Sequence, residues 1–138
     1  MAAEACLVVR SDTSELSRVS RWVDDWAREC RLSAVLTHHL DLCASELVAN
    51  VVDHAHDDDA AHPIRLRLQM LGDRVCFEIE DDGKPFDPVS APAPMRATDP
   101  EHARIGGWGI AIVRHFAEDL TYLRTEAGNR LTVFFRIQ

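Results

Sequence analysis

The stretch E-L-V-A-N-V-V-D-H, running from Glu46 to His54, decides the fold of this chain of 138 residues. Its apolar residues recur at spacings of three and four, which predicts the buried face of an amphipathic helix. Glu46, Asn50 and His54 recur at every fourth position, so they lie one above another along an edge of that face. Taken alone, the same pattern fits a solvated polar edge beside the core. The helix is expected to run from Ser33 to about residue 56.

The segments that flank this helix predict a single α+β domain spanning residues 1–138. Strands are predicted where apolar and polar residues alternate or short apolar runs occur, at 6–9, 64–70, 75–80, 120–125 and 131–137. Further helices are predicted at 13–30 and 108–117. Turns at 72–73 and 127–129 join two pairs of strands into hairpins. We therefore expect a two-layer sandwich, with helices on one face of a mixed, largely antiparallel sheet.

A second polar motif, D-D-G-K-P-F-D-P, occupies residues 81–88, where a predicted strand ends. The carboxylate of Asp81 can accept a hydrogen bond from a ligand amine, and Gly83 lets the backbone turn tightly or approach a ligand closely. Taken alone, the motif also fits an ordinary Asp-Gly turn. Residues 84–104 contain five prolines and no periodicity, which predicts a long functional loop.

A third motif, G-G-W-G-I-A-I-V, places Gly106, Gly107 and Gly109 at the start of a predicted helix. The first turn of a helix carries unpaired N–H groups and the positive end of the helix dipole, and both favour a phosphate group. No Gly-Lys-Ser/Thr follows, and no strand of a βαβ unit precedes, so neither a P-loop nor a dinucleotide-binding fingerprint is present. A glycine cluster of this kind is weak support for a phosphate site on its own.

The order of the three motifs is more specific than any one of them. As E-L-x-x-N-x-x-x-H, D-x-G-x-x-F-D and G-G-x-G-I-x-I-V, they resemble the N box and the two glycine boxes of the GHKL (Bergerat-fold) ATPases. Within that superfamily the chain resembles the small anti-sigma factor serine-protein kinases of the RsbW and SpoIIAB type, over nearly its whole length. Sensor histidine kinases usually carry D-x-G-x-G in the first glycine box, whereas Lys-Pro-Phe follows Gly83 here.

The resemblance implies a role for each motif residue. Asn50 would coordinate the Mg²⁺ ion that bridges the phosphates of ATP, a task that suits an amide oxygen. Glu46 would be the general base that activates or orients the attacking hydroxyl or water, and His54 would lie one turn further along the site. Asp81 would accept a hydrogen bond from the adenine amino group, and Gly83 would let the base pack closely.

The same resemblance assigns the phosphates to Gly106, Gly107 and Gly109, with Arg104 as a further cation and residues 84–104 as the ATP lid. The implied activity is transfer of the γ-phosphoryl group of Mg·ATP to a serine of a STAS-domain anti-anti-sigma protein, in a partner-switching circuit. The same protein would also sequester a sigma factor, and it would be a homodimer. One alternative is an ATP-binding regulatory module that sequesters its partner without phosphoryl transfer. Another is an ATPase or nucleotide-binding regulator that serves a different pathway.

Composition narrows the classes of partner and the compartment. Fifteen Lys and Arg residues face 23 Asp and Glu residues, and a net charge of −8 without a basic run argues against direct nucleic-acid binding. The four cysteines form no C-x-x-C pair and lie in apolar runs, which predicts buried free thiols in a reducing compartment. No apolar stretch approaches the ~20 residues that span a bilayer, so a cytoplasmic protein without membrane contact is expected.

Overall fold

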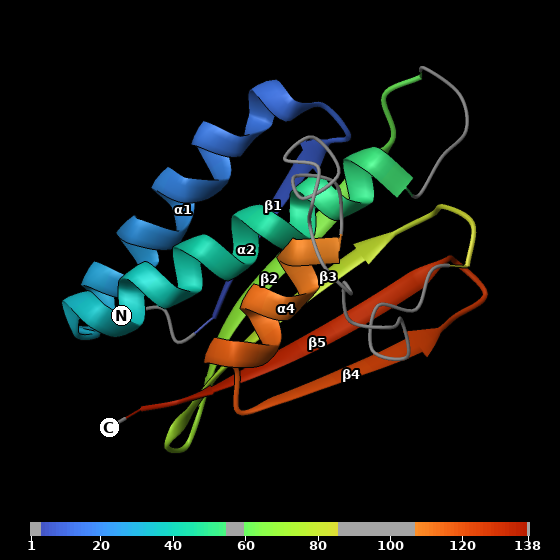
Figure 1. Ribbon diagram of the computed structural model, residues 1–138. Helices are drawn as coiled ribbons and strands as arrows, with labels where there is room; N and C mark the ends of the chain where they lie inside the picture. Colours follow the sequence, from blue (N-terminus) through green and yellow to red (C-terminus); the bar gives the residue numbers. More distant parts are fainter. Residues whose placement is uncertain (1–3, 55–59, 86–106, 138) are drawn as a thin grey trace.

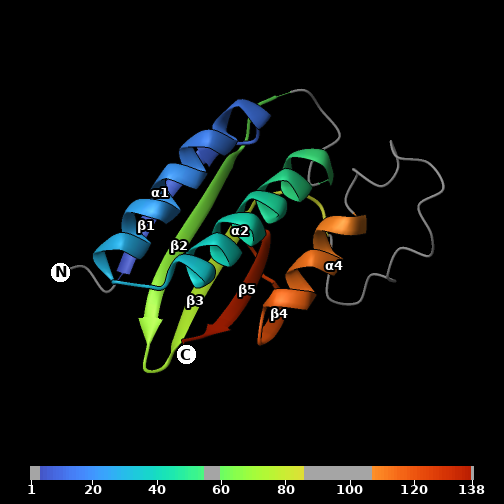
Figure 2. The ribbon, with the colours of Figure 1, turned by 60° about the vertical axis from the view of Figure 1, so that its left-hand side comes forward.

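The computed structural model describes residues 4–54, 60–85 and 107–137, which form two layers. The strands are β1 (Glu4–Arg10), β2 (Pro63–Leu71), β3 (Arg74–Asp81), β4 (Asp119–Arg124) and β5 (Asn129–Arg136). The helices of this part are a 3-10 turn η1 (Thr13–Glu15), α1 (Leu16–Glu29), α2 (Ala34–His54) and α4 (Gly107–Phe116). Figures 1 and 2 show α1, α2 and α4 over one face of the sheet, with α2 between the other two. The expected two-layer α+β architecture is confirmed.

The described strands form one sheet in the order β1-β2-β3-β5-β4, and every pairing between neighbours is antiparallel. The expectation of a mixed sheet is therefore not met in this part of the chain. The expected turn at 127–129 is also one residue too long, because Asn129 is the first residue of β5. It pairs with Asp81 of β3 on one side and with Arg124 of β4 on the other. This register brings the start of β5 against the motif that follows β3.

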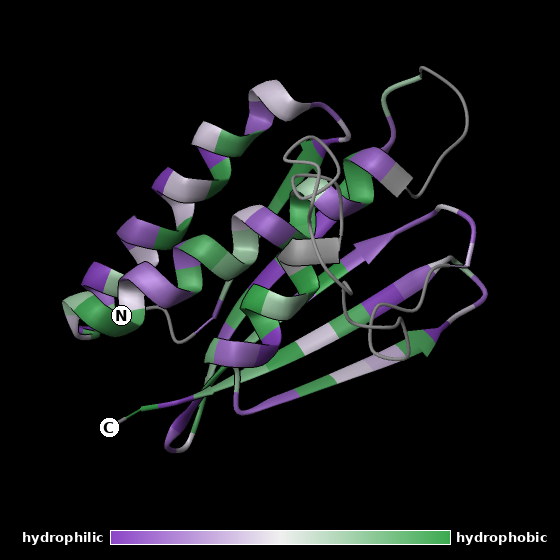
Figure 3. Cartoon of the chain, viewed as in Figure 1, coloured by the Kyte–Doolittle hydropathy of each residue, from purple (hydrophilic) through white to green (hydrophobic). Residues whose placement is uncertain are grey.

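The core lies between the sheet and the three α-helices. Alternation along the strands sends apolar side chains toward the helices, and Figure 3 shows the alternating bands of hydrophobic and hydrophilic residues. On α2 the buried stripe follows the predicted spacing of three and four residues, and it extends toward the start of the helix: Leu40, Cys43, Ala44, Leu47, Val48 and Val51. Full burial of a leucine or valine side chain, as at Leu40, Leu47 and Val48, contributes roughly 1.5–3 kcal/mol to folding. None of the described helices combines the length and apolarity needed to cross a membrane.

Local hydrogen bonds set where α2 begins and fix it against α1. Ser33 caps the helix, because its Oγ accepts from the backbone N–H of Leu36 at 3.1 Å. Further along α2, both carboxylate oxygens of Asp41 lie 2.7 Å from the Ser20 Oγ on α1. The bond between Ser20 and Asp41 holds α2 against α1, and so helps to position the polar edge that begins at Glu46.

The cysteines are free thiols, as predicted, but they are not all buried. Cys43 and Cys76 are buried and Cys30 is partly exposed, whereas Cys6 is exposed. The expectation was wrong for Cys6 because β1 alternates, with Ala5, Leu7 and Val9 less exposed than the residues between them. Cys6 is therefore on the face of the sheet that the helices do not cover.

Candidate functional site

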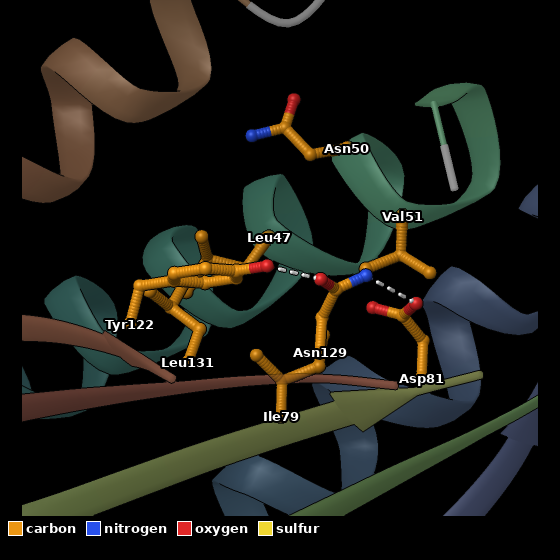
Figure 4. A pocket seen from close by; sticks show the side chains of 8 residues that line it. All are labelled: Leu47, Asn50, Val51, Ile79, Asp81, Tyr122, Asn129 and Leu131. Atoms are coloured by element: carbon orange, nitrogen blue, oxygen red, sulfur yellow. Dashed lines mark hydrogen bonds between the residues drawn. The ribbon is translucent and has the colours of Figure 1, made fainter. Parts of the chain in front are cut away.

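A small cavity lies where α2 crosses the end of β3 and the start of β5 (Figure 4). Its lining combines apolar and polar side chains, namely Leu47, Asn50, Val51, Ile79, Asp81, Tyr122, Asn129 and Leu131. The cavity has a volume of about 30 Å³. Ligand sites for small molecules start at roughly 300 Å³, so the described residues enclose only the inner end of a site of that class.

Asp81 is the buried carboxylate of this cavity, with an exposed fraction of 7%. Its Oδ1 accepts from the backbone N–H of Gly83 at 2.8 Å and from Nδ2 of Asn129 at 3.0 Å. The first of these bonds closes a tight turn directly after β3, for which an Asp-x-Gly sequence is suited. Within the described part of the chain no hydrogen bond reaches Oδ2 of Asp81. One oxygen is thus fixed by the protein and the other remains an acceptor for a ligand.

Asn129 connects Asp81 to the neighbouring strand. Its Nδ2 also donates to the backbone oxygen of Lys84 at 2.8 Å, and its Oδ1 accepts from the Tyr122 hydroxyl at 2.5 Å and from Arg124 Nη1 at 3.3 Å. The same Arg124 nitrogen donates to the backbone oxygen of Gly83 at 2.7 Å. Figure 4 shows the Asn129 amide between the Tyr122 hydroxyl and the Asp81 carboxylate. The turn after β3 is therefore joined by side-chain hydrogen bonds to both β4 and β5.

Gly128 allows this close approach of the β4–β5 turn to the end of β3. It has a φ of +150°, and a Cβ atom built on it would lie 1.9 Å from the backbone oxygen of Asp81. No side chain can be accommodated at that separation without movement of the backbone. Glycine at this position is thus a requirement of the site geometry.

Asn50 belongs to the same cavity but faces a different direction. It lies on α2 with an exposed fraction of 4%, and its Nδ2 has no hydrogen-bond partner among the described residues. Figure 4 shows its side chain pointing away from the pair formed by Asp81 and Asn129. A buried amide without a partner costs free energy, so this position is explained better by a ligand than by folding alone.

Glu46 lies one helical turn before Asn50, is partly buried, and is not among the residues that line the cavity. The negative charge of its carboxylate influences the pKa of Cys43, a residue on the buried side of α2. Burial raises the pKa of the Cys43 thiol to about 12, and the negative charge of Glu46 adds to the rise. Glu46 therefore lies on α2 one helical turn before a residue that lines the cavity, and outside the lining itself.

The structure brings together some of the residues predicted from the sequence and leaves others outside. Asn50 and Asp81 share one cavity, and Gly83 is hydrogen-bonded to Asp81. Gly107 and Gly109 lie in the first turn of α4, as the third motif predicted. The remaining predictions fall outside the described residues or side chains: the side chain of His54, Arg104, Gly106, and most of the lid expected at 84–104.

Sequence reasoning missed Tyr122, Arg124 and Asn129. The sequence did contain a signal for Asn129. One strand ends at Asp81 and another begins after Gly128, and antiparallel pairing of these two strands brings Asp81 opposite Asn129. Because Asn129 was predicted to lie in a turn, its pairing with Asp81 was not recognised. An amide, a phenol and a guanidinium near strand ends also match no known functional motif.

Comparisons with known proteins agree with the fold and with the motifs. A family model described as the histidine kinase-like ATPase domain matches residues 9–135. The serine/threonine-protein kinase BtrW of Bordetella bronchiseptica is 34% identical over 131 residues, which is 90% of this chain and 92% of that protein.

Solved structures show the same fold at low sequence identity. The RsbU and RsbW domains of Rv1364c from Mycobacterium tuberculosis match with a TM-score of 0.71 and 16% identity, over 99% of this chain and 33% of that one. The blue-light activated histidine kinase of Erythrobacter litoralis matches with a TM-score of 0.58 and 16% identity, over 91% of this chain and 41% of that one. The chain thus spans a third to two fifths of these structures. With a family model that covers nearly all of it, the chain belongs to the histidine kinase-like ATPase domain family.

Proposed function

We propose that the protein is a serine/threonine-protein kinase that uses Mg·ATP and acts as an anti-sigma factor in a partner-switching circuit. Its substrate would be a serine of a STAS-domain anti-anti-sigma protein, and its second partner a sigma factor. Family membership and the 34% identity to a serine/threonine-protein kinase support the activity class. A homodimer and the identity of both partners remain part of the proposal.

One observation carries the nucleotide-binding part of the proposal: Asp81 and Asn50 line the same cavity from opposite sides. Asp81 Oδ2 would accept a hydrogen bond from a ligand donor, and the exocyclic amino group of adenine is such a donor. The apolar lining, with Val51, Ile79 and Leu131, suits the faces of a purine ring. Since the cavity holds only about 30 Å³, a nucleotide would place the edge of its base there and extend outward along α2.

The residues on α2 also fit a magnesium ion. Mg²⁺ prefers oxygen ligands, and it usually keeps several waters while binding one or two protein groups together with substrate phosphates. Asn50 would offer its amide oxygen to the ion, and its Nδ2, which has no partner in the described part of the chain, would donate to a phosphate oxygen. When bound there, the ion would neutralise charge on the phosphates during transfer.

Glu46 would serve as the general base for the transfer. It lies on the polar edge of α2, one turn from Asn50, on the side nearer the start of the helix. In that role its carboxylate accepts the proton of the substrate serine while the serine oxygen bonds to the γ-phosphorus and ADP leaves. Gly107 and Gly109, in the first turn of α4, would provide backbone N–H groups for the phosphates.

Phosphoryl transfer to a STAS-domain protein encoded beside this chain is the direct test. The protein, Mg·ATP and that substrate are mixed, and phosphoserine is located by mass spectrometry. We expect stoichiometric phosphorylation of one serine, and a Glu46→Gln variant should be slower by roughly 10²–10⁴-fold while retaining ATP. Bound ATP without transfer to any such partner would refute the kinase activity.

A regulatory module that binds ATP without transferring phosphate is the second candidate. The observation in its favour is that Glu46 is absent from the residues lining the cavity. A Glu46→Ala variant separates the two candidates. If the protein is a kinase, the variant no longer phosphorylates the STAS-domain protein, and its control of the sigma factor changes. If it is a binding module, the variant retains its full regulatory effect on the sigma factor.

A further inference from the structure

We propose that Asn129, held in one orientation by Tyr122 and Arg124, sets the base selectivity of the nucleotide site by fixing the Asp81 carboxylate. The inference rests on the proposed nucleotide binding and extends it to three residues outside the sequence motifs. In this role they are positioning residues, because they act on the base through Asp81.

The orientation of the Asn129 amide follows from the chemistry of its partners. Asp81 Oδ1 and the backbone oxygen of Lys84 lie 3.0 and 2.8 Å from Nδ2, and a carbonyl oxygen can only accept. Arg124 Nη1 lies 3.3 Å from Oδ1, and a guanidinium can only donate. If the amide were flipped, its oxygen would face the backbone oxygen of Lys84, and its NH₂ group would face the N–H groups of Arg124. Neither pair could form a hydrogen bond. The Tyr122 hydroxyl, at 2.5 Å from Oδ1, supports the same orientation.

The fixed amide in turn fixes the carboxylate. Oδ1 of Asp81 receives two donors, from Gly83 and Asn129, on a side chain that is 7% exposed. A rotation that displaces Oδ1 would break these two bonds, so they favour one orientation of the carboxylate and one position of Oδ2 in the cavity. Only a group that donates a hydrogen bond complements that oxygen. Adenine presents an amino group at the relevant edge, whereas guanine presents a carbonyl oxygen.

Arg124 extends the same control to the backbone of the turn. Its Nη1 donates to the Gly83 oxygen at 2.7 Å, so the guanidinium contacts both the amide and the turn on which Asp81 depends. Releasing the amide lets Asp81 rotate and lets Oδ2 leave its position. The affinity for an adenine nucleotide should then fall. The affinity for a guanine nucleotide bound in the same orientation should change little, because its O6 carbonyl would face Oδ2 and form no hydrogen bond with it.

Affinities of the intact protein for ATP and GTP with Mg²⁺, measured by titration calorimetry, test this inference through a double-mutant cycle. Tyr122→Phe removes only the hydroxyl of the chain's single tyrosine, and Asn129→Ala removes the amide. We expect the ratio of ATP to GTP affinity to fall about fivefold in Tyr122→Phe and about tenfold in Asn129→Ala. The double variant should match Asn129→Ala alone, because Tyr122 acts only through that amide. Thr121→Val, on the opposite face of β4, is the matched control and should leave the ratio unchanged.

The possible outcomes distinguish the two levels of the proposal. If the parent protein binds neither nucleotide, nucleotide binding itself is wrong and this inference falls with it. If the parent binds ATP but the variants lose ATP and GTP equally, or the two substitutions add, selectivity does not pass through Asn129. Should Asn129→Ala not fold, Asn129→Asp keeps the side-chain volume and the contacts to Tyr122 and Arg124. In this variant the new carboxylate faces that of Asp81, so the two should repel each other. An unchanged ratio of ATP to GTP affinity would likewise overturn the inference.

Discussion

Substitution of Gly128 by alanine should damage both the stability and the nucleotide site of this protein. The added Cβ would lie 1.9 Å from the Asp81 oxygen, where ordinary contact begins at 3.4 Å, so the β4–β5 turn must move by about 1.5 Å. A shift of that size would break the 2.7 Å hydrogen bond from Arg124 to Gly83. Overpacking costs about 1–3 kcal/mol, and a φ of +150° adds strain, so we expect a loss of roughly 3 kcal/mol.

Gly72→Ala is the matched control for this prediction. Gly72 also has a positive φ, of +62°, but nothing lies within 4 Å of a Cβ built on it. It should therefore lose only about 1 kcal/mol, with ATP affinity unchanged. Thermal unfolding and ATP titration of both variants provide the measurement, and Gly128→Ala should melt roughly 10 °C below the parent. Equal melting temperatures for the two variants, or full ATP affinity in Gly128→Ala, would show that the close approach to Asp81 is not required.

Three further predictions concern the core, the helix contact and the thiols. Phe77→Ala, at a side chain that is 1% exposed, should lower the free energy of unfolding by about 3–5 kcal/mol in a denaturant titration, whereas Val35→Ala, at 66% exposed, should change it by less than about 0.5 kcal/mol. Asp41→Ala removes the acceptor that binds α1 to α2 and should cost about 1–2 kcal/mol in the same titration. In a maleimide time course read by mass spectrometry at pH 8, Cys6 should react first. Cys43 is buried and its pKa is raised to about 12 by desolvation, so little thiolate forms at pH 8 and that residue should stay unmodified until the protein unfolds.

Periodicity predicted most of the fold because burial on one face leaves a regular signal in the sequence. The stripe on α2 and the alternation in β2 and β3 are examples. The start of α2 and both bounds of β2 and β3 agree with the structure to within one residue, whereas the predicted end of the helix near residue 56 lies outside the described residues. Two details carried no such signal. The direction of strand pairing depends on how distant segments meet, so a purely antiparallel sheet could not be distinguished from a mixed one. The alternation in β1 was too short to show that Cys6 faces away from the helices.

The candidate site was predicted in part, for a related reason. Asn50 and Asp81 belong to motifs whose residue types and spacing indicate chemistry, and they do share a cavity. Tyr122, Arg124 and Asn129 act through tertiary hydrogen bonds that no local pattern encodes. Their contribution depends on the register between β3 and β5, which the sequence suggests only after both strands have been paired.

The proposal that Asp81 binds adenine at the inner end of the site is tested most directly by titrating Mg·ATP and Mg·GTP into the parent and into Asp81→Asn. The asparagine keeps an oxygen for the bonds from Gly83 and Asn129, so the variant should fold normally, but it replaces the acceptor Oδ2 by a donor. We expect one ATP per parent chain, a loss of roughly 10- to 100-fold in ATP affinity in the variant, and a shift of preference toward GTP. Unchanged ATP affinity in a folded Asp81→Asn protein would contradict the nucleotide site derived from this cavity.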